Sequence, residues 1–105
     1  MVVQIIRFRL SGLSDEEFRA DAESLAPTWA DLPGLVYKTW LANSETNTYG
    51  GVYLWRDRAA MEAYLASELF KGFEENAAFV DASCEDFELW EGPSAVTRSP
   101  IPAAA

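Results

Sequence analysis

The order of strand-like and helix-like segments is the feature that most limits the folds open to this chain. Strand segments are rich in β-branched and aromatic residues, and helical segments carry apolar residues at spacings of three and four. In chain order we expect the strand 2–10, the helix 15–29, the strands 34–43 and 49–56, a helical pattern over 57–76 and the strand 79–90. This β-α-β-β-α-β order predicts a ferredoxin-like α+β fold, in which the helices cover one face of a four-stranded antiparallel sheet.

Local signals mark the helix ends. Ser14 followed by Glu17 is the capping-box pattern that begins a helix. Asp57 is a typical N-cap for the second helical pattern. Pro27 lies near the end of the first helix, where it is expected to loosen the last turn.

The central strands are apolar on both faces, which two helices alone do not explain. The strand 34–43 offers Tyr37 on one face and Trp40 on the other, and the strand 49–56 offers Tyr53 on one face and Val52 on the other. A sheet face open to water normally carries polar residues at alternate positions. The helices of one short chain cover one face, so we predict that a second copy covers the other, giving a homodimer of sheets packed face to face.

Two glycines interrupt the strand YGGVYLW, at Gly50 and Gly51. Glycine weakens a strand and often marks close approach of a neighbouring group. Gly51 shares parity with the large rings of this strand, so its missing side chain predicts a hollow among them. We expect a ring of the partner sheet to fill this hollow, with a ligand as the alternative; a pocket would then lie on the helix side, near Trp29, Lys38 and Trp40.

Charge and composition exclude several classes of protein. The chain has 17 acidic and 8 basic residues and a net charge of −9, which argues against binding to nucleic acid or to an anionic membrane. It has no apolar run near the roughly 18 residues of a spanning helix. Arg7 and Arg9 lie within the first apolar stretch, unlike the charges of a signal peptide. We therefore predict a cytoplasmic protein.

The absence of histidine is the most restrictive fact of the composition. It removes the commonest general base, the commonest metal ligand and the usual haem ligand. The single cysteine, Cys84, excludes a disulfide within the chain and any multi-cysteine metal site. Without a histidine to activate it, Cys84 fits inert packing better than a reactive thiol. We predict a protein that needs neither a metal nor a cofactor.

The segments LPGLVYKTW and YGGVYLWRDRAAMEAYL resemble the YdhR-like putative mono-oxygenase family of the dimeric α+β barrel superfamily. The similarity covers roughly residues 32–66. The residues that carry it are Pro33, Gly34, Tyr37, Lys38, Trp40, Gly50 to Trp55 and Ala63 to Leu65. The resemblance implies the ferredoxin-like fold, pairing of two chains as a dimeric α+β barrel, and a mono-oxygenase activity.

Lys38 is the first candidate catalytic residue. It shares a face of its strand with Trp40, the second candidate, and a lysine on an apolar face must be paired or must line a cavity. In the functional interpretation Lys38 holds an anionic substrate oxygen or a peroxide. In the structural interpretation it pairs with a carboxylate such as Glu85 or Asp86, or extends to the sheet edge.

The aromatic residues supply the remaining candidates. Cofactor-free oxygenases of this fold surround a phenolic substrate with Trp, Tyr and Asn side chains, and the electron-rich phenolate itself reduces O₂. The predicted substrate-binding residues are Trp29, Tyr37, Tyr53, Trp55 and Tyr64, each of which could equally be plain core. Asn43 is the third predicted catalytic residue, as a donor to an oxyanion, with a turn residue as the alternative.

Two functions stay open from the sequence. The first is a cofactor-independent mono-oxygenase for an aromatic or polycyclic phenol, with an isomerase or cyclase as a variant in the same pocket. The second is a non-catalytic homodimer that binds a small hydrophobic ligand or serves as a stress-associated accessory protein. We place the folded domain at residues 1–91 and predict a flexible tail, rich in Pro and Ala, over residues 92–105.

Overall fold

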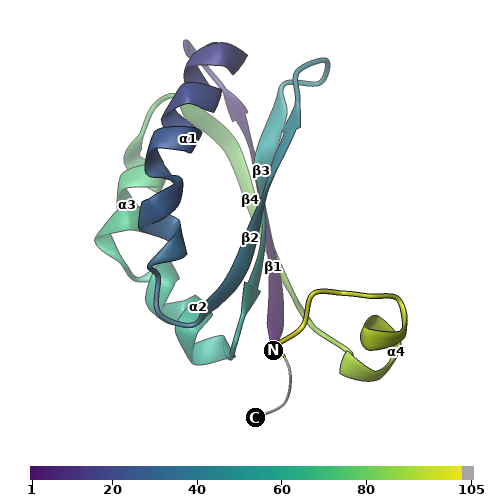
Figure 1. Cartoon of the computed structure of the whole chain (residues 1–105). Helices are drawn as coiled ribbons and strands as arrows, with labels where there is room; N and C mark the ends of the chain where they lie inside the picture. The colour runs from purple at the N-terminus through teal and green to yellow at the C-terminus, as the bar shows by residue number, and fades with distance from the viewer. Residues whose placement is uncertain (103–105) are drawn as a thin grey trace.

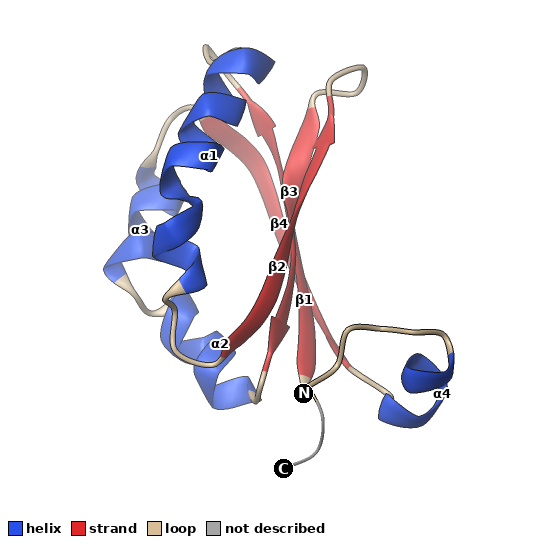
Figure 2. Cartoon of the chain, in the orientation of Figure 1, coloured by secondary structure: helices blue, strands red, loops and turns tan. Residues whose placement is uncertain are grey.

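A computed structural model describes residues 1–102 and confirms the ferredoxin-like fold. Its sheet is antiparallel, with the strand order β2-β3-β1-β4. The strands are β1 Val2–Leu10, β2 Leu35–Asn43, β3 Thr48–Trp55 and β4 Phe79–Glu88, and the helices are α1 Asp15–Ala30, α2 Arg58–Leu65, α3 Glu68–Glu75 and α4 Glu91–Val96. Helices α1, α2 and α3 cover one face of the sheet, and α4 lies on the opposite side (Figures 1 and 2).

The helix ends follow the local signals. The Ser14 hydroxyl accepts the backbone N–H of Glu17, and the Glu17 carboxylate accepts the backbone N–H of Ser14, so the predicted capping box is present. The second helical pattern, however, forms two helices. Ala66 ends α2, and the Ser67 hydroxyl accepts the backbone N–H of Phe70 to begin α3. A side-chain cap at Ser67 allows the chain to change direction here while the apolar spacing continues.

A bulge in β2 decides which residues of this strand face the helices. The pairing with β3 shifts between Leu35 and Tyr37. As a result, Leu35 packs on the helix side, whereas Tyr37 lies opposite Leu54 on the other face. One extra residue reverses the alternation of side chains along a strand. Strict alternation without the bulge would place Leu35 and Tyr37 on the same face.

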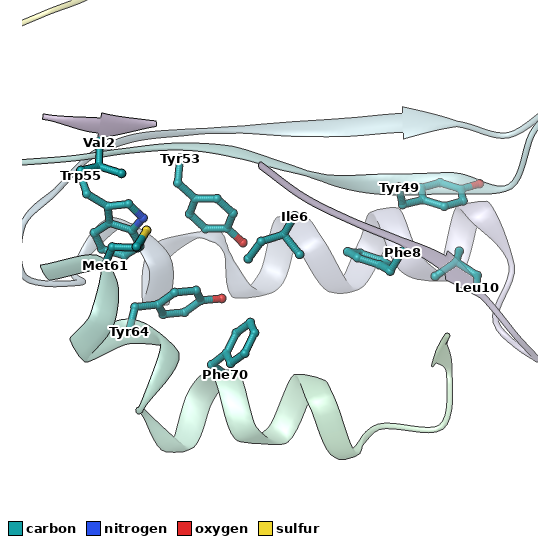
Figure 3. Close-up of a cluster of buried hydrophobic side chains, with 10 residues drawn as sticks. All are labelled: Val2, Ile6, Phe8, Leu10, Tyr49, Tyr53, Trp55, Met61, Tyr64 and Phe70. Atoms are coloured by element: carbon teal, nitrogen blue, oxygen red, sulfur yellow. The ribbon is translucent and has the colours of Figure 1, made fainter. Parts of the chain in front are cut away.

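The core lies between the sheet and helices α1 to α3. Alternate residues of β1 and β3 point toward the helices and meet side chains of α2 and α3 (Figure 3). The buried apolar cluster consists of Val2, Ile6, Phe8, Leu10, Tyr49, Tyr53, Trp55, Met61, Tyr64 and Phe70. Gln4 is also fully buried, and its side-chain oxygen accepts the indole N–H of Trp55 at 2.9 Å while its amide nitrogen donates to the sulfur of Cys84 at 3.2 Å. The polar group is therefore satisfied.

The segment after β4 is partly structured. Helix α4, Glu91–Val96, begins one residue before the flexible tail predicted over 92–105 and overlaps its first residues. Pro100 lies beside Tyr37 and Val52 on the face of the sheet away from α1 to α3. The mobility of this segment in solution stays a prediction, and residues 103–105 lie outside the described residues.

Candidate functional site

A cavity of about 340 Å³ lies between the sheet and helices α1, α2 and α3. This volume is near the lower end of the range for small-molecule sites, roughly 300–1,000 Å³. Its lining is Ile6, Phe8, Phe18, Asp21, Ala22, Leu25, Trp29, Lys38, Trp40, Tyr53, Tyr64, Glu68, Leu69, Gly72, Phe73, Asn76 and Phe79. Most of these side chains are apolar or aromatic, and a few polar groups converge among them.

The amine of Lys38 is the central polar group of the cavity. Its Nζ lies 3.3 Å from the ring centroid of Trp40, 4.3 Å from that of Trp29 and 4.8 Å from that of Tyr53. Lys38 and Tyr53 are paired neighbours on β2 and β3, and Trp29 reaches them from the end of α1. Ring faces attract an ammonium group, with about 0.5–2 kcal/mol for each contact. Lys38 is therefore enclosed by three aromatic faces.

Gly51 provides the space that the Lys38 side chain occupies. A Cβ added at Gly51 would lie 2.8 Å from Cε of Lys38 and 3.2 Å from a ring carbon of Tyr53, closer than such atoms normally approach. Gly51 lies opposite Trp40 and faces the helices. The prediction that a ring of a partner sheet fills this hollow is therefore wrong, because the hollow is on the helix-covered face and Lys38 fills it.

Lys38 has no carboxylate partner among the described residues. Glu85, one suggested partner, pairs with Arg7 at 2.8 Å, and Asp86, the other, pairs with Arg58 at 2.8 Å. Glu85 and Asp86 both lie on β4, at the opposite edge of the sheet from β2. The structural interpretation that paired Lys38 with either of these residues is wrong.

Burial lowers the pKa of Lys38 from 10.5 to about 7. Removal of an ammonium group from water disfavours its charged form, and no anion compensates for that loss here. The three ring faces act in the opposite direction, since each stabilises the ammonium. Both the amine and the ammonium are therefore accessible near neutral pH.

Two tyrosine hydroxyls add hydrogen-bonding groups to the cavity. The indole N–H of Trp29 donates to the hydroxyl of Tyr64 at 3.3 Å. Figure 3 shows the hydroxyls of Tyr53 and Tyr64 pointing toward the same region, near Ile6. Burial raises the pKa of both hydroxyls, so each keeps its proton at neutral pH and can donate it to a ligand oxygen.

The structure brings together five of the eight residues predicted for the site. Trp29, Lys38, Trp40, Tyr53 and Tyr64 all line the cavity. They come from α1, β2, β3 and α2, so they are distant in sequence. Their proximity is a geometric finding, and their roles in binding or catalysis stay predictions.

The other three predicted site residues, Tyr37, Asn43 and Trp55, do not line the cavity. Tyr37 alternates with Lys38 along β2 and therefore lies on the opposite face of the sheet. Asn43 is exposed at the hairpin, where its side-chain oxygen accepts the backbone N–H of Thr46 at 3.3 Å, as a turn residue does. Trp55 is fully buried in the core, and its ring stacks at 5.9 Å against that of Tyr53. Trp55 therefore contacts a residue of the cavity wall without lining the cavity itself.

Sequence reasoning missed three polar residues of the cavity lining: Asp21, Glu68 and Asn76. A signal existed for Asp21, because it follows Phe18 by three residues and precedes Leu25 by four. These spacings place the carboxylate on the apolar face of α1. Glu68 begins α3 and Asn76 ends it, and nothing in the local pattern distinguishes them from ordinary helix-end residues.

Two kinds of feature are absent from residues 1–102. Within this range no three His, Cys, Asp or Glu side chains are grouped so that they could hold a metal ion. None of the helices there combines the length and hydropathy required to cross a membrane.

The family comparison matches residues 3–100 to the family described as "Putative mono-oxygenase ydhR". The chain belongs to this family. The resemblance inferred from the segments around Lys38 and Gly51 is thus confirmed, and it extends over nearly the whole chain. The comparison with curated proteins gave no match.

Solved structures show the same fold at low sequence identity. SnoaB from Streptomyces nogalater, described as a cofactor-independent oxygenase, is 24% identical with a TM-score of 0.67, over 85% of this chain and 92% of that chain. A putative antibiotic biosynthesis monooxygenase from Deinococcus radiodurans is 14% identical with a TM-score of 0.71, over 88% and 95%. The heme-degrader MhuD from Mycobacterium tuberculosis, solved with two hemes in its active site, is 19% identical with a TM-score of 0.68, over 85% and 95%.

Proposed function

We propose that this protein is a cofactor-independent mono-oxygenase that acts on an aromatic or polycyclic phenol bound in the cavity. The observation that carries the proposal is the Lys38 amine, held among three ring faces without a carboxylate partner in the described chain. Such a group is suited to an anionic oxygen on an aromatic ligand. Membership of the mono-oxygenase family and the shared fold of SnoaB support the reaction class.

The aromatic walls would hold the rings of the substrate. Trp29, Trp40 and Tyr53 offer ring faces and edges on one side of the cavity, and ring pairs contribute about 0.5–1.5 kcal/mol beyond the area they bury. The hydroxyls of Tyr53 and Tyr64 would donate hydrogen bonds to substrate oxygens. Lys38 would hold the phenolate oxygen, so the electron-rich ring is oriented before O₂ arrives.

The reaction proposed is oxidation of an activated methylene group of the phenol. One methylene proton is lost to solvent, its electron pair joins the phenolate ring system, and that system transfers one electron to O₂. The carbon-centred radical and superoxide combine to form a carbon–oxygen bond at the former methylene. The peroxide then takes up one proton and loses water, with the second methylene hydrogen, to leave a carbonyl group. One oxygen atom of O₂ enters the product, and the other leaves as water with the two hydrogens of the methylene. Lys38 would stabilise the negative charge of the phenolate and of the peroxide.

Oxygen uptake with dithranol, a tricyclic phenol with one oxidisable methylene, tests this proposal. We expect uptake above the rate without protein, and we expect Lys38→Met to lower kcat/KM by about a hundredfold or more. Tyr37→Phe is the matched control, because Tyr37 lies one residue away on the opposite face. It should stay within about twofold of the wild-type rate, as expected for a residue that does not touch the reacting atoms.

Binding of dithranol without oxygen uptake would contradict the proposed reaction. That result would favour the alternative from the sequence, a non-catalytic protein that binds a small hydrophobic ligand. Equal rates for wild type and Lys38→Met would contradict the role given to Lys38.

The proposal includes a homodimer formed by the sheet face away from α1, α2 and α3. Val3, Ile5 and Val52 are half-buried on this face, and Phe87 is 48% exposed. Apolar side chains left partly open to water on a sheet face are suited to packing against a second sheet. A cytoplasmic location, predicted from the sequence, also belongs to this proposal.

A further inference from the structure

The cavity combines two features with opposite effects on an anionic ligand. Its interior holds the Lys38 side chain, whose ammonium form attracts an anion. Its exposed rim carries the carboxylates of Asp21 and Glu68, and the whole chain has a net charge of −9. A negatively charged ligand is therefore favoured inside the cavity and opposed on the way in.

We propose that Lys38 is the proton acceptor of the site: an uncharged phenol enters the cavity and transfers its hydroxyl proton to the Lys38 amine. The O–H bond breaks with its electron pair left on oxygen, and the lone pair of Nζ forms the new N–H bond. The products are a phenolate and an ammonium group side by side, and no further reactant is needed. This inference rests on the proposed function, since it specifies the form in which the substrate enters.

The surroundings of Lys38 favour the neutral amine before the proton transfer and the ammonium form after it. In the empty cavity the amine is enclosed by rings and has no carboxylate partner among residues 1–102, so burial favours the neutral base. The lowered pKa of Lys38, about 7, has the same cause. After proton transfer, the phenolate supplies the missing opposite charge and the three ring faces stabilise the ammonium.

No other ionisable group of the cavity is placed as well to accept this proton. In chain order these groups are Asp21 on α1, Tyr53 on β3, Tyr64 on α2 and Glu68 on α3. Burial raises the pKa of both tyrosines, which keeps them as donors. The two carboxylates are exposed, and a carboxylate is a much weaker base than an amine. The cavity lining from β1 and β4 is apolar, and Cys84 on β4 contacts Gln4 instead.

Anaerobic binding of a naphthol at about pH 8 tests the inference, because a phenolic hydroxyl has a pKa of about 10 and is protonated in free solution. Absorption distinguishes bound naphthol from bound naphtholate. Calorimetry in two buffers of different ionisation enthalpy counts the protons released per ligand. We expect the wild-type protein to hold naphtholate with no proton released to the buffer, since the proton moves to Lys38.

Two variants calibrate these readouts. Lys38→Met should bind the naphthol as the neutral phenol, at least tenfold more weakly and without proton release. Lys38→Arg carries a charge that cannot accept a proton, so it should hold naphtholate and release one proton per ligand. The wild-type absorption and proton count together decide the inference even if a variant does not fold.

Three wild-type results would overturn the inference. Release of one proton per bound naphthol would show that Lys38 is already an ammonium group. A bound species with the absorption of neutral naphthol would show that no transfer occurs. Failure to bind a naphthol at millimolar concentration would show that phenols are not ligands of this cavity.

The oxygen-uptake experiment separates this inference from the proposed function. Formation of bound naphtholate without oxygen uptake on dithranol would leave Lys38 as the proton acceptor of a binding site and would reject the mono-oxygenase. Oxygen uptake on dithranol with neutral naphthol in the cavity would retain the enzyme and reject Lys38 as its base.

Discussion

The two faces of the sheet are built from alternate residues of the same strands, yet their surroundings differ. On β2, Lys38 and Trp40 face the helices and line the cavity, whereas Tyr37 and Thr39 face the other side. The helix-covered face is enclosed by α1, α2 and α3 (Figure 1). The cavity leaves the space on this face incompletely filled. The opposite face carries apolar residues such as Val52 beside the Arg7–Glu85 ion pair, and the C-terminal segment lies near Val52.

This difference suits one face to ligand binding and the other to association with a second chain. A cavity needs walls that keep their positions when it is empty, and the three helices provide them. An association surface needs apolar area that stays accessible until a partner arrives. The same alternation of side chains therefore supplies a candidate site on one face and a candidate interface on the other. The predictions below test whether the two faces can be changed separately.

The largest effect is expected from a charge on the open face. Val52→Asp should weaken the proposed dimer more than a hundredfold, because an unpaired buried charge costs about 3 kcal/mol or more and a two-fold interface contains it twice. Sedimentation at micromolar concentration should give twice 11.7 kDa for the wild type and 11.7 kDa for the variant.

Ala20→Asp is the control for that experiment, since Ala20 is exposed on α1, on the side of the sheet away from the proposed interface. It should leave the mass of the dimer unchanged. A wild-type protein that sediments as a stable monomer would contradict the role of this face, and retention of naphthol binding in the Val52→Asp monomer would show that the two faces act independently.

The next effect concerns Gly50, where a larger side chain would meet the backbone of β1 and not the cavity. A Cβ added at Gly50 would overlap the carbonyl oxygen of Ile6 on β1, and neither strand can move without loss of pairing. Gly50→Ala should therefore lower the free energy of unfolding by about 2–3 kcal/mol. Urea denaturation measures this change, and a variant as stable as the wild type would show that the strands adjust.

Gly51→Ala should have a smaller effect on stability and a specific effect on the site. Its Cβ would meet Cε of Lys38, near the flexible end of a side chain, so a cost of about 1 kcal/mol or less is expected. The displaced Lys38 amine should bind naphthol more weakly. Unchanged naphthol affinity, measured beside Gly50→Ala, would show that Lys38 does not need the space at Gly51.

The last effect is a pH dependence of stability caused by Lys38, which is modest for each pH unit and accumulates across the window. Its folded pKa of about 7 is below the unfolded value of 10.5, so between these values the unfolded chain binds more protons. The free energy of unfolding should therefore rise with pH across this window, at up to about 1.4 kcal/mol per pH unit, and the cost of the buried charge is felt in full below it.

Urea denaturation of wild type and Lys38→Met across this window checks the sign. The difference between the two should grow in favour of the wild type as pH rises, because methionine binds no proton. Subtraction also removes the contributions of Tyr53 and Tyr64, which both proteins share. Parallel curves would mean that Lys38 titrates normally.

Much of the fold was predictable from local patterns, because the segments concerned depend on near neighbours in the chain. The capping box at Ser14 and the four strands rest on spacing and cap chemistry that act over a few residues. The shared face of Lys38 and Trp40 followed from strand alternation and was correct. The boundary between α2 and α3 at Ser67 was harder to predict, since the apolar spacing continues from one helix into the next.

The candidate site was predictable only in part. Trp29 and Tyr64 are predicted site residues because they are aromatic, and both line the cavity. The sequence does not distinguish them from Trp55, which is also aromatic but lies in the core. A ring becomes part of a cavity wall when the elements around it leave space, and that depends on packing between segments far apart in sequence. Asp21 was overlooked for a different reason, since its place on the apolar face of α1 was readable from spacing.

Residue identity and short-range patterns were sufficient for the order of the four strands, the absence of histidine and the family. Tertiary structure decided the meaning of Gly51 and Lys38. Whether a missing side chain is filled by a partner, a ligand or a neighbouring residue depends on which face of the sheet the helices cover. Here the helices cover the face of Gly51, so Lys38 from the adjacent strand occupies the space and its amine is held among the rings of Trp29, Trp40 and Tyr53.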